Sequence, residues 1–157
     1  MEEDRLMLKT LKIDDSVCLS LMPQLQRYTG AIDSSQKPIL LSCLRTAIIE
    51  VQDRSGRSIA PCEMRLDISC NSSAFVPLYG NVSGVSAVRT PEGADVDYTL
   101  CDGGVDTGNA VYERLVIDYT TSIDEGESMR LLPVVFQYAA ALFDGQTEML
   151  PKIIAQC

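Results

Sequence analysis

Apolar residues recur at helical spacing through one stretch in the first third of the chain. The members of this stripe are Leu40, Leu41, Leu44, Ala47, Ile48 and Val51. Before it, Ser34 and Ser35 are residue types that cap helices, and Pro38 is tolerated in a first turn. After it, Gly56 can adopt the left-handed conformation that ends a helix. The pattern therefore predicts a long helix over residues 36–57.

From residue 62 the apolar period changes to two, with Met64, Leu66, Ile68 and Cys70 alternating with Glu63, Arg65, Asp67 and Ser69. This alternation predicts a strand with one buried and one solvated face. A second extended segment covers residues 82–90, and the Pro-Glu-Gly-Ala turn after it predicts that residues 95–100 return as its hairpin partner. Residues 112–119 alternate again, so we expect a sheet of about four strands.

The chain before the long helix has a weaker pattern. Residues 1–15 mix charges with apolar positions and predict either a short strand or an arm held by a neighbouring molecule. One of residues 14–16, an Asp-Asp-Ser run, can then cap a first helix that stops at Gly30. Pro23 falls inside that helix, where it either kinks the helix or marks a later start.

A last helix is predicted over residues 132–143, opened by Leu132-Pro133 and closed by Asp144-Gly145. Residues 146–157 then form a short tail with four large apolar side chains, and an apolar chain end of this kind usually has a docking site. The candidate docking residues are Met149, Leu150, Ile153 and Ile154.

These elements predict an α+β protein, with helices packed on a small, mostly antiparallel sheet and with extended N- and C-terminal arms. With 157 residues, 46% of them hydrophobic, the chain is long enough for one core and too short for two comfortable domains. We therefore expect one domain over residues 1–145, followed by the tail. Its parts are an N-terminal arm and short helix (1–35), the long helix (36–57), the sheet (62–119) and the final helix (132–143).

The formal charge of −9 argues against binding along a nucleic-acid backbone, because Lys and Arg must replace condensed counterions there and no basic stripe is present. The first residues lack the basic and apolar regions of a secretory signal. The most apolar stretch, residues 131–143, is too short to cross a bilayer. We therefore expect a soluble, intracellular protein that does not bind a membrane.

Candidate chemistry is sparse. The six cysteines contain no CxxC pair, so we interpret them as reduced thiols, and the chain has no His for a zinc site or a catalytic base. Residues 102–109 carry oxygen ligands but lack the EF-hand spacing, which favours a plain flexible loop over a Ca²⁺ site. We therefore expect no metal, no cofactor and no enzymatic activity.

Several local sequences share an order with a known family. Residues 44–57 end in Arg-Ser-Gly-Arg, like a helix closed by a TGR-type turn, and residues 64–67 look like the strand that follows such a turn. Residues 82–100 resemble a V-x-S-V hairpin, residues 115–120 a V-T-Y-T strand, and residues 132–142 a P-x-x-l-x-x-A-i helix. This order resembles the head-to-tail adaptor family of tailed bacteriophages, also called head-tail connector, head-completion or ring proteins.

The resemblance implies a structural virion protein at the junction of capsid and tail, assembled in the cytoplasm of a bacterial host. About twelve copies would form a ring beneath the portal vertex, bridge it to the tail or to further ring proteins, and let DNA pass through without sequence-specific binding. The acidic composition fits a channel wall that does not grip DNA. The family's carboxy-terminal segment often docks on the portal protein, which makes residues 146–157 the candidate portal-docking tail.

Two other classes stay open from the residues alone. One is an enzyme, which would need a concave site with perturbed carboxylates. The other is favoured over it: a small soluble β-rich module that binds a partner or ligand, without catalytic activity, accounts for the same composition.

Overall fold

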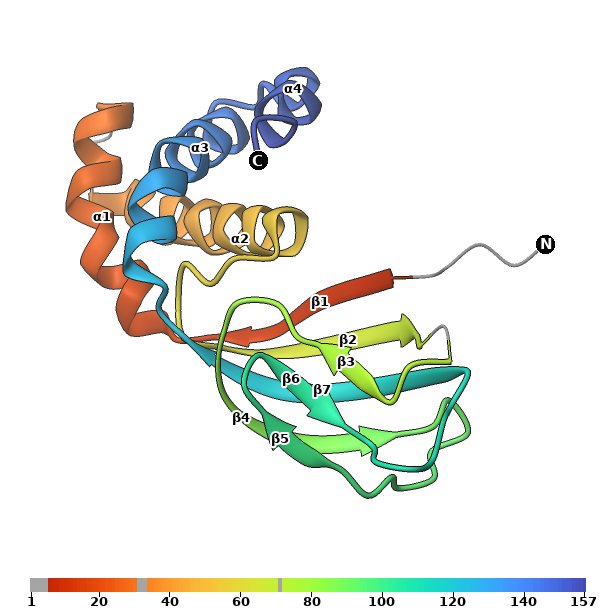
Figure 1. Cartoon of the computed structure of the whole chain (residues 1–157). Coiled ribbons are helices and arrows are strands. Elements are labelled where there is room, and N and C mark those ends of the chain that lie inside the picture. Colours follow the sequence, from red (N-terminus) through yellow and green to blue (C-terminus); the bar gives the residue numbers. More distant parts are fainter. Residues whose placement is uncertain (1–5, 31–33, 71) are drawn as a thin grey trace. The chain divides into compact units, whose positions relative to one another are not determined.

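The computed structural model describes residues 6–30, 34–70 and 72–157, and it confirms the α+β class. The chain divides into two compact units, which we call the sheet unit (Met1–Lys12 and Cys62–Ser122) and the helical unit (Ile13–Pro61 and Ile123–Cys157). Each unit is therefore built from segments far apart in the sequence (Figure 1). The chain passes between the units at three points, after residues 12, 61 and 122.

The sheet unit contains a four-stranded sheet in the order β1-β2-β7-β4 (Figure 1). Its strands are β1 (Leu6–Ile13), β2 (Cys62–Ser69), β7 (Arg114–Ser122) and β4 (Asn81–Arg89). Both β2 and β4 run antiparallel to β7. The alternation in the sequence is confirmed, since Met64 and Leu66 of β2 lie opposite Tyr119 and Ile117 of β7 and all four are buried. Of the two predictions for residues 1–15, a short strand or an arm, the structure contains a strand at residues 6–13. Residues 1–5 lie outside the described part.

Paired charges line the other face of β2 and β7. Arg65 donates two hydrogen bonds to the Asp118 carboxylate, of 2.7 and 3.0 Å, and Arg114 donates two of 2.7 Å to Asp67. Arg65 and Asp118 are direct register partners, so this bidentate pair lies across the ladder. The hydrogen bond from Arg65 holds the pKa of Asp118 below its usual value. The two pairs neutralise the charge at the centre of this face.

A second, three-stranded sheet was not predicted, and it corrects two expectations. Its order is β3 (Phe75–Pro77), β6 (Gly104–Asp106) and β5 (Thr99–Cys101). Residues 95–100 form only an isolated bridge to β4, between Asp95 and Arg89, before the chain turns to pair with β6. Residues 102–109 contain β6, so the prediction of a plain flexible loop was wrong.

The physical reason lies in the two residues between β5 and β6. Asp102-Gly103 is a strong two-residue hairpin sequence, and Gly103 has a φ of 79° that other residues rarely adopt. Gly104 is also required, because a Cβ there would clash with the Val76 carbonyl oxygen and the Phe75 ring on the neighbouring strand β3. The hairpin therefore forms at residues 99–106, where the sequence contains its turn.

The helical unit consists of α1 (Asp15–Thr29), α2 (Lys37–Ser55), α3 (Glu125–Phe143) and the short α4 (Leu150–Ile154). Two 3-10 turns, Ser34–Gln36 and Thr147–Met149, precede α2 and α4. The apolar stripe of α2 is confirmed, because Leu40, Leu44, Ala47, Ile48 and Val51 are all fully buried. Helix α2 packs against α1 and α3, and α4 packs against α3.

The helix ends agree with the sequence in part. Asp14 caps α1 by accepting a hydrogen bond from the Ser16 N–H at 2.9 Å, and Gly30 ends the helix in the left-handed conformation. Pro23 lies inside α1, so it does not mark a later start. The capping of α2 by Ser34 or Ser35 was wrong: Gln36 occupies the cap position and no side chain caps the helix, because the preceding residues form a 3-10 turn.

Helix α3 begins at Glu125 rather than at Leu132. The Asp124 side chain caps it by accepting a hydrogen bond from the Glu127 N–H at 3.4 Å. Two carboxylates in the first turn, Glu125 and Glu127, favour the positive end of the helix dipole. Pro133 lies within the helix and marks no boundary, because tertiary packing tolerates the missing N–H there. The Asp-x-x-Glu capping pattern at residues 124–127 was the overlooked sequence signal.

The segment after α2 is held by a buried carboxamide. The Gln52 side chain is fully buried, and its Oε1 accepts hydrogen bonds of 2.9 Å from both the Ile59 and Ala60 N–H groups. Two carbonyl groups of the same segment, residues 58–61, accept backbone hydrogen bonds. The Pro61 carbonyl accepts one from the Asp14 N–H, and the Ser58 carbonyl accepts one from the Asp124 N–H. This segment therefore joins the starts of α1 and α3 to the end of α2.

Replacing Gln52 with Leu should lower the free energy of unfolding by about 3 kcal/mol, because two buried backbone N–H groups lose their acceptor. Chemical denaturation in urea measures the change. Gln24→Leu, at an exposed position of α1, is the matched control and should stay within about 0.5 kcal/mol of the wild type. Equal stability of the Gln52→Leu variant and the wild type would contradict the role of this carboxamide.

The Arg65–Asp118 pair predicts a pH dependence. Because the folded pKa of Asp118 is lowered, its stabilisation is present above the unfolded pKa of about 3.9 and is lost as the pH falls through the folded value. At neutral pH, Arg65→Gln should be less stable than the wild type by roughly 0.5–1 kcal/mol, since Arg65 is partly exposed. Urea denaturation at a series of pH values should show this gap closing in acid. Arg27→Gln, an exposed change on α1, should show no such gap.

Candidate interaction surfaces

The chemically reactive side chains of the described residues include carboxylates and thiols but no His. They include no group of three or more Cys, Asp or Glu side chains placed to hold a metal ion. No disulfide joins the six cysteines, and burial raises the pKa of the Cys18, Cys43, Cys70 and Cys157 thiols, which keeps them protonated and weakly nucleophilic. Nor does any helix in these ranges have the length and apolar character needed to span a bilayer. The remaining candidates are surfaces for binding other molecules.

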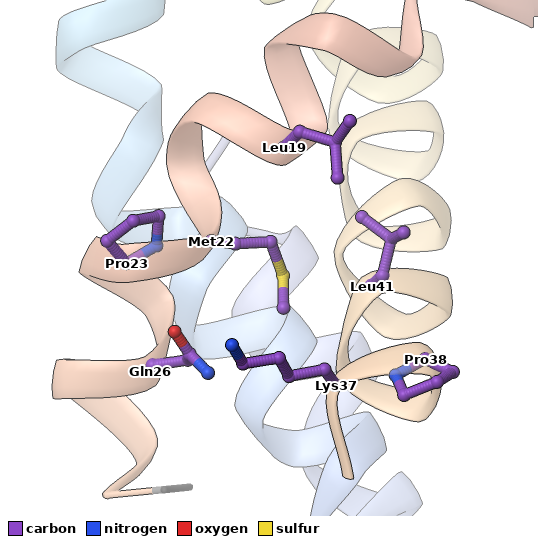
Figure 2. A pocket seen from close by; sticks show the side chains of 7 residues that line it. All are labelled: Leu19, Met22, Pro23, Gln26, Lys37, Pro38 and Leu41. Atoms are coloured by element: carbon purple, nitrogen blue, oxygen red, sulfur yellow. The ribbon is translucent and has the colours of Figure 1, made fainter. Parts of the chain in front are cut away.

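A groove lies between α1 and the first turn of α2, and we call it the α1–α2 groove (Figure 2). Its volume is about 440 Å³. The lining side chains are Leu19, Met22, Pro23, Gln26, Lys37, Pro38 and Leu41. Leu19 is 60% exposed, so the apolar wall is open to solvent. The groove is suited to an apolar side chain of a binding partner rather than to a polar metabolite.

The polar residues of the groove lie at one end. Figure 2 shows Gln26 and Lys37 together there, while Leu19, Met22 and Leu41 face the space further along. Lys37 begins α2, whose N-terminus has no side-chain cap, so its positive charge adds to the positive end of the helix dipole. A partner segment that combines an apolar side chain with a carboxylate would match both ends of the groove.

The structure separates the four predicted docking residues of the tail. Met149 is 44% exposed and Leu150 and Ile154 are half-buried, whereas Ile153 is only 5% exposed. Helix α4 packs on α3, and the Gln156 side chain donates a hydrogen bond to the Gln137 carboxamide oxygen at 3.0 Å. Ile153 therefore belongs to the core of the helical unit, and Met149 is the one of the four that offers an open apolar surface.

Strand β1 presents a second apolar surface, at one edge of the four-stranded sheet. Met7, Lys9 and Leu11 lie on one face of the strand and are all exposed. Leu6 and Lys12 lie on its other face and are exposed as well. Between residues 6 and 13 the sequence contains these two lysines and no carboxylate. We call these five residues the β1 surface. It is apolar and cationic in an acidic protein.

The opposite character is found in residues 90–113, which we call the acidic segment. It contains six carboxylates and no Lys or Arg: Glu92, Asp95, Asp97, Asp102, Asp106 and Glu113. Exposed apolar side chains lie between them, with Tyr98 37%, Leu100 47% and Val111 56% exposed. This run of like charges is legible in the sequence, but its place on β5 and the adjoining loops required the structure.

Comparison with known proteins identifies solved structures that have a similar fold. No protein-family model matches the chain, and no curated protein matches it. Solved structures that are similar to it include the following three. One chain is from the neck of a native gene transfer agent (GTA) particle computed with C12 symmetry. It has 17% identity and a TM-score of 0.56, and the match covers 91% of this chain and 84% of that chain.

The second chain is from the neck of an empty GTA particle computed with C6 symmetry, with 19% identity, a TM-score of 0.58, and coverage of 88% of this chain and 84% of that chain. The third is from the virion of a native gene transfer agent particle, with 18% identity, a TM-score of 0.56, and coverage of 88% and 84%. At these identities the similarity establishes a shared fold. It agrees with the resemblance to head-to-tail adaptors found in the sequence.

The burial of the tail predicts different effects for two of its residues. Ile153→Ala should lower the free energy of unfolding by about 2–4 kcal/mol, because it removes buried methyl groups beneath α4. Met149→Ala should change it by less than about 0.5 kcal/mol, because the side chain is largely exposed. Urea denaturation of both variants measures the difference. Equal, small effects would show that α4 does not pack stably on the helical unit.

Proposed function

We propose that this protein is a structural component of the neck of a tailed, phage-like particle, without enzymatic activity. About twelve copies form a ring beneath the portal vertex, connect the DNA-filled capsid to the tail, and let DNA pass. The single observation that carries this proposal is the shared fold over 88–91% of the chain with chains from particle necks. The C12 and C6 symmetries with which those necks were computed support a ring of this size.

The distribution of surfaces also supports a ring. Copies in a closed ring meet through two different patches, one on each side of the subunit. The described residues offer several distinct apolar surfaces, namely the α1–α2 groove, the β1 surface and the apolar residues of the acidic segment. Binding is the chemistry that these exposed apolar surfaces support.

The charge is consistent with passage of DNA. With a net charge of −9, most of the protein's field repels phosphates, and a repulsive wall lets DNA slide where Lys and Arg would retard it. In this proposal the other partners are the portal protein on one side and the tail or further ring proteins on the other. Within the tail, Met149 is the residue that docks on the portal protein.

The test is assembly with the portal protein encoded in the same genome. Purified protein mixed with that portal protein should give a portal-bound ring of about twelve copies by mass photometry and cryo-electron microscopy, and the protein alone is measured for comparison. Met149→Asp should reduce co-sedimentation with the portal protein about tenfold, because it places a carboxylate in an apolar contact. Glu148→Ala, at the preceding exposed residue, is the control and should bind normally.

Two outcomes would contradict the proposal at different levels. A protein that stays monomeric and has no affinity for the portal protein would contradict the neck function and favour a small partner- or ligand-binding module. Normal portal binding by Met149→Asp would leave the neck function standing and reject the tail as the docking site.

A further inference from the structure

The two edges of the four-stranded sheet differ. Strand β4, at one edge, has two register shifts against β7, and its outer side is met by the Arg89–Asp95 bridge and by the Val96 N–H donating to the Val88 carbonyl. Strand β1, at the other edge, is eight residues long and contains neither Gly nor Pro. No strand of the described ranges pairs with its outer side. An open edge of this kind is a template for pairing with another chain.

The side chains of β1 restrict what can pair with it. Two lysines deter pairing with a copy of the same strand, because like charges would then face each other. Among the described residues, no ion pair joins Lys9 or Lys12 to a carboxylate. Met7 and Leu11 flank Lys9 on the same face and are 59% and 41% exposed. The matching surface therefore combines apolar side chains with carboxylates.

The same chain presents such a surface on its small sheet. Strand β5 is an edge of that sheet, and its Leu100 is exposed next to the exposed Tyr98. Asp97 and Asp102 flank the strand, are exposed, and make no ion pair with a described residue. Apolar and charged residues are thus matched on the two edge strands, with opposite signs of charge.

We propose that the β1 surface of one copy docks on β5 and its flanking carboxylates in the next copy. The inference rests on the proposed ring and names the contact between its neighbouring subunits. The two patches differ, so the contact is heterologous and repeats around a closed ring without a special end. On one face of β1, Lys9 meets Asp102 while Met7 and Leu11 meet Tyr98 and Leu100. On the other face, Lys12 meets Asp97. The opposite charges fix the register, and the apolar side chains supply the buried area.

A charge exchange tests this contact. The first variant carries Lys9→Glu and Lys12→Glu, the second Asp97→Lys and Asp102→Lys, and the third all four changes. The first and second should each raise the concentration needed for ring assembly by about tenfold or more, because like charges then face each other. The third should restore assembly to near the wild-type level. Mass photometry under the conditions in which the wild type forms rings measures this, and circular dichroism checks that each variant is folded.

The control carries Arg27→Glu and Arg54→Glu, which change the net charge by the same amount at exposed sites of the helical unit, and it should assemble like the wild type. Unchanged assembly of the first or second variant would overturn the contact, as would failure of the four-change variant to recover. In both of those outcomes the wild type still forms rings, so the proposed function stands. If the wild type and the control form no ring, alone or with the portal protein, the neck function and the contact both fail.

Discussion

The Gln52 carboxamide is the interaction on which the arrangement of the chain depends. It is buried at the end of α2 and holds the N–H groups of Ile59 and Ala60. The segment it fixes accepts hydrogen bonds from Asp14 and Asp124, the residues that precede α1 and α3. These positions lie beside the three points at which the chain passes between its two units. One side chain thus fixes the segment that joins the end of α2 to the starts of α1 and α3 within the helical unit, because buried backbone groups without partners would be costly there.

Charge is organised differently on the two parts of the sheet unit. On β2 and β7 each arginine has a carboxylate partner, so Arg65–Asp118 and Arg114–Asp67 form locally neutral pairs. The acidic segment contains six carboxylates and no cation, and Asp95 is the one of the six that forms an ion pair with a described residue, Arg89. Pairing supports the register of a ladder, whereas uncompensated charge of one sign acts at a distance and selects partners. This difference is the reason to assign the ladder to stability and the acidic segment to binding.

Long periodic segments were predictable from the sequence, and short or atypical ones were not. The apolar stripe of α2 and the alternation of β2 were predicted correctly, because burial imposes a period on many residues at once. The small sheet has three-residue strands that are too short to show a period, although Asp102-Gly103 contained its turn. The helix predicted at residues 132–143 is shorter than α3, because Pro133 resembles a helix start and hides the start that the Asp124 cap provides. The α1–α2 groove is formed by residues from two helices, which no local pattern reveals.

The proposed subunit contact and the proposed DNA channel make competing demands on the same carboxylates. A carboxylate that meets Lys9 or Lys12 of a neighbouring copy is neutralised and removed from water, so it no longer repels DNA. Asp97 and Asp102 flank β5 and are assigned to the contact, and Asp95 is paired with Arg89. This leaves Glu92, Asp106 and Glu113 of the acidic segment without either role. If both proposals hold, these three carboxylates face the channel or the adjoining ring. The acidity of the chain then has two separate physical origins, pairing between copies and repulsion of DNA.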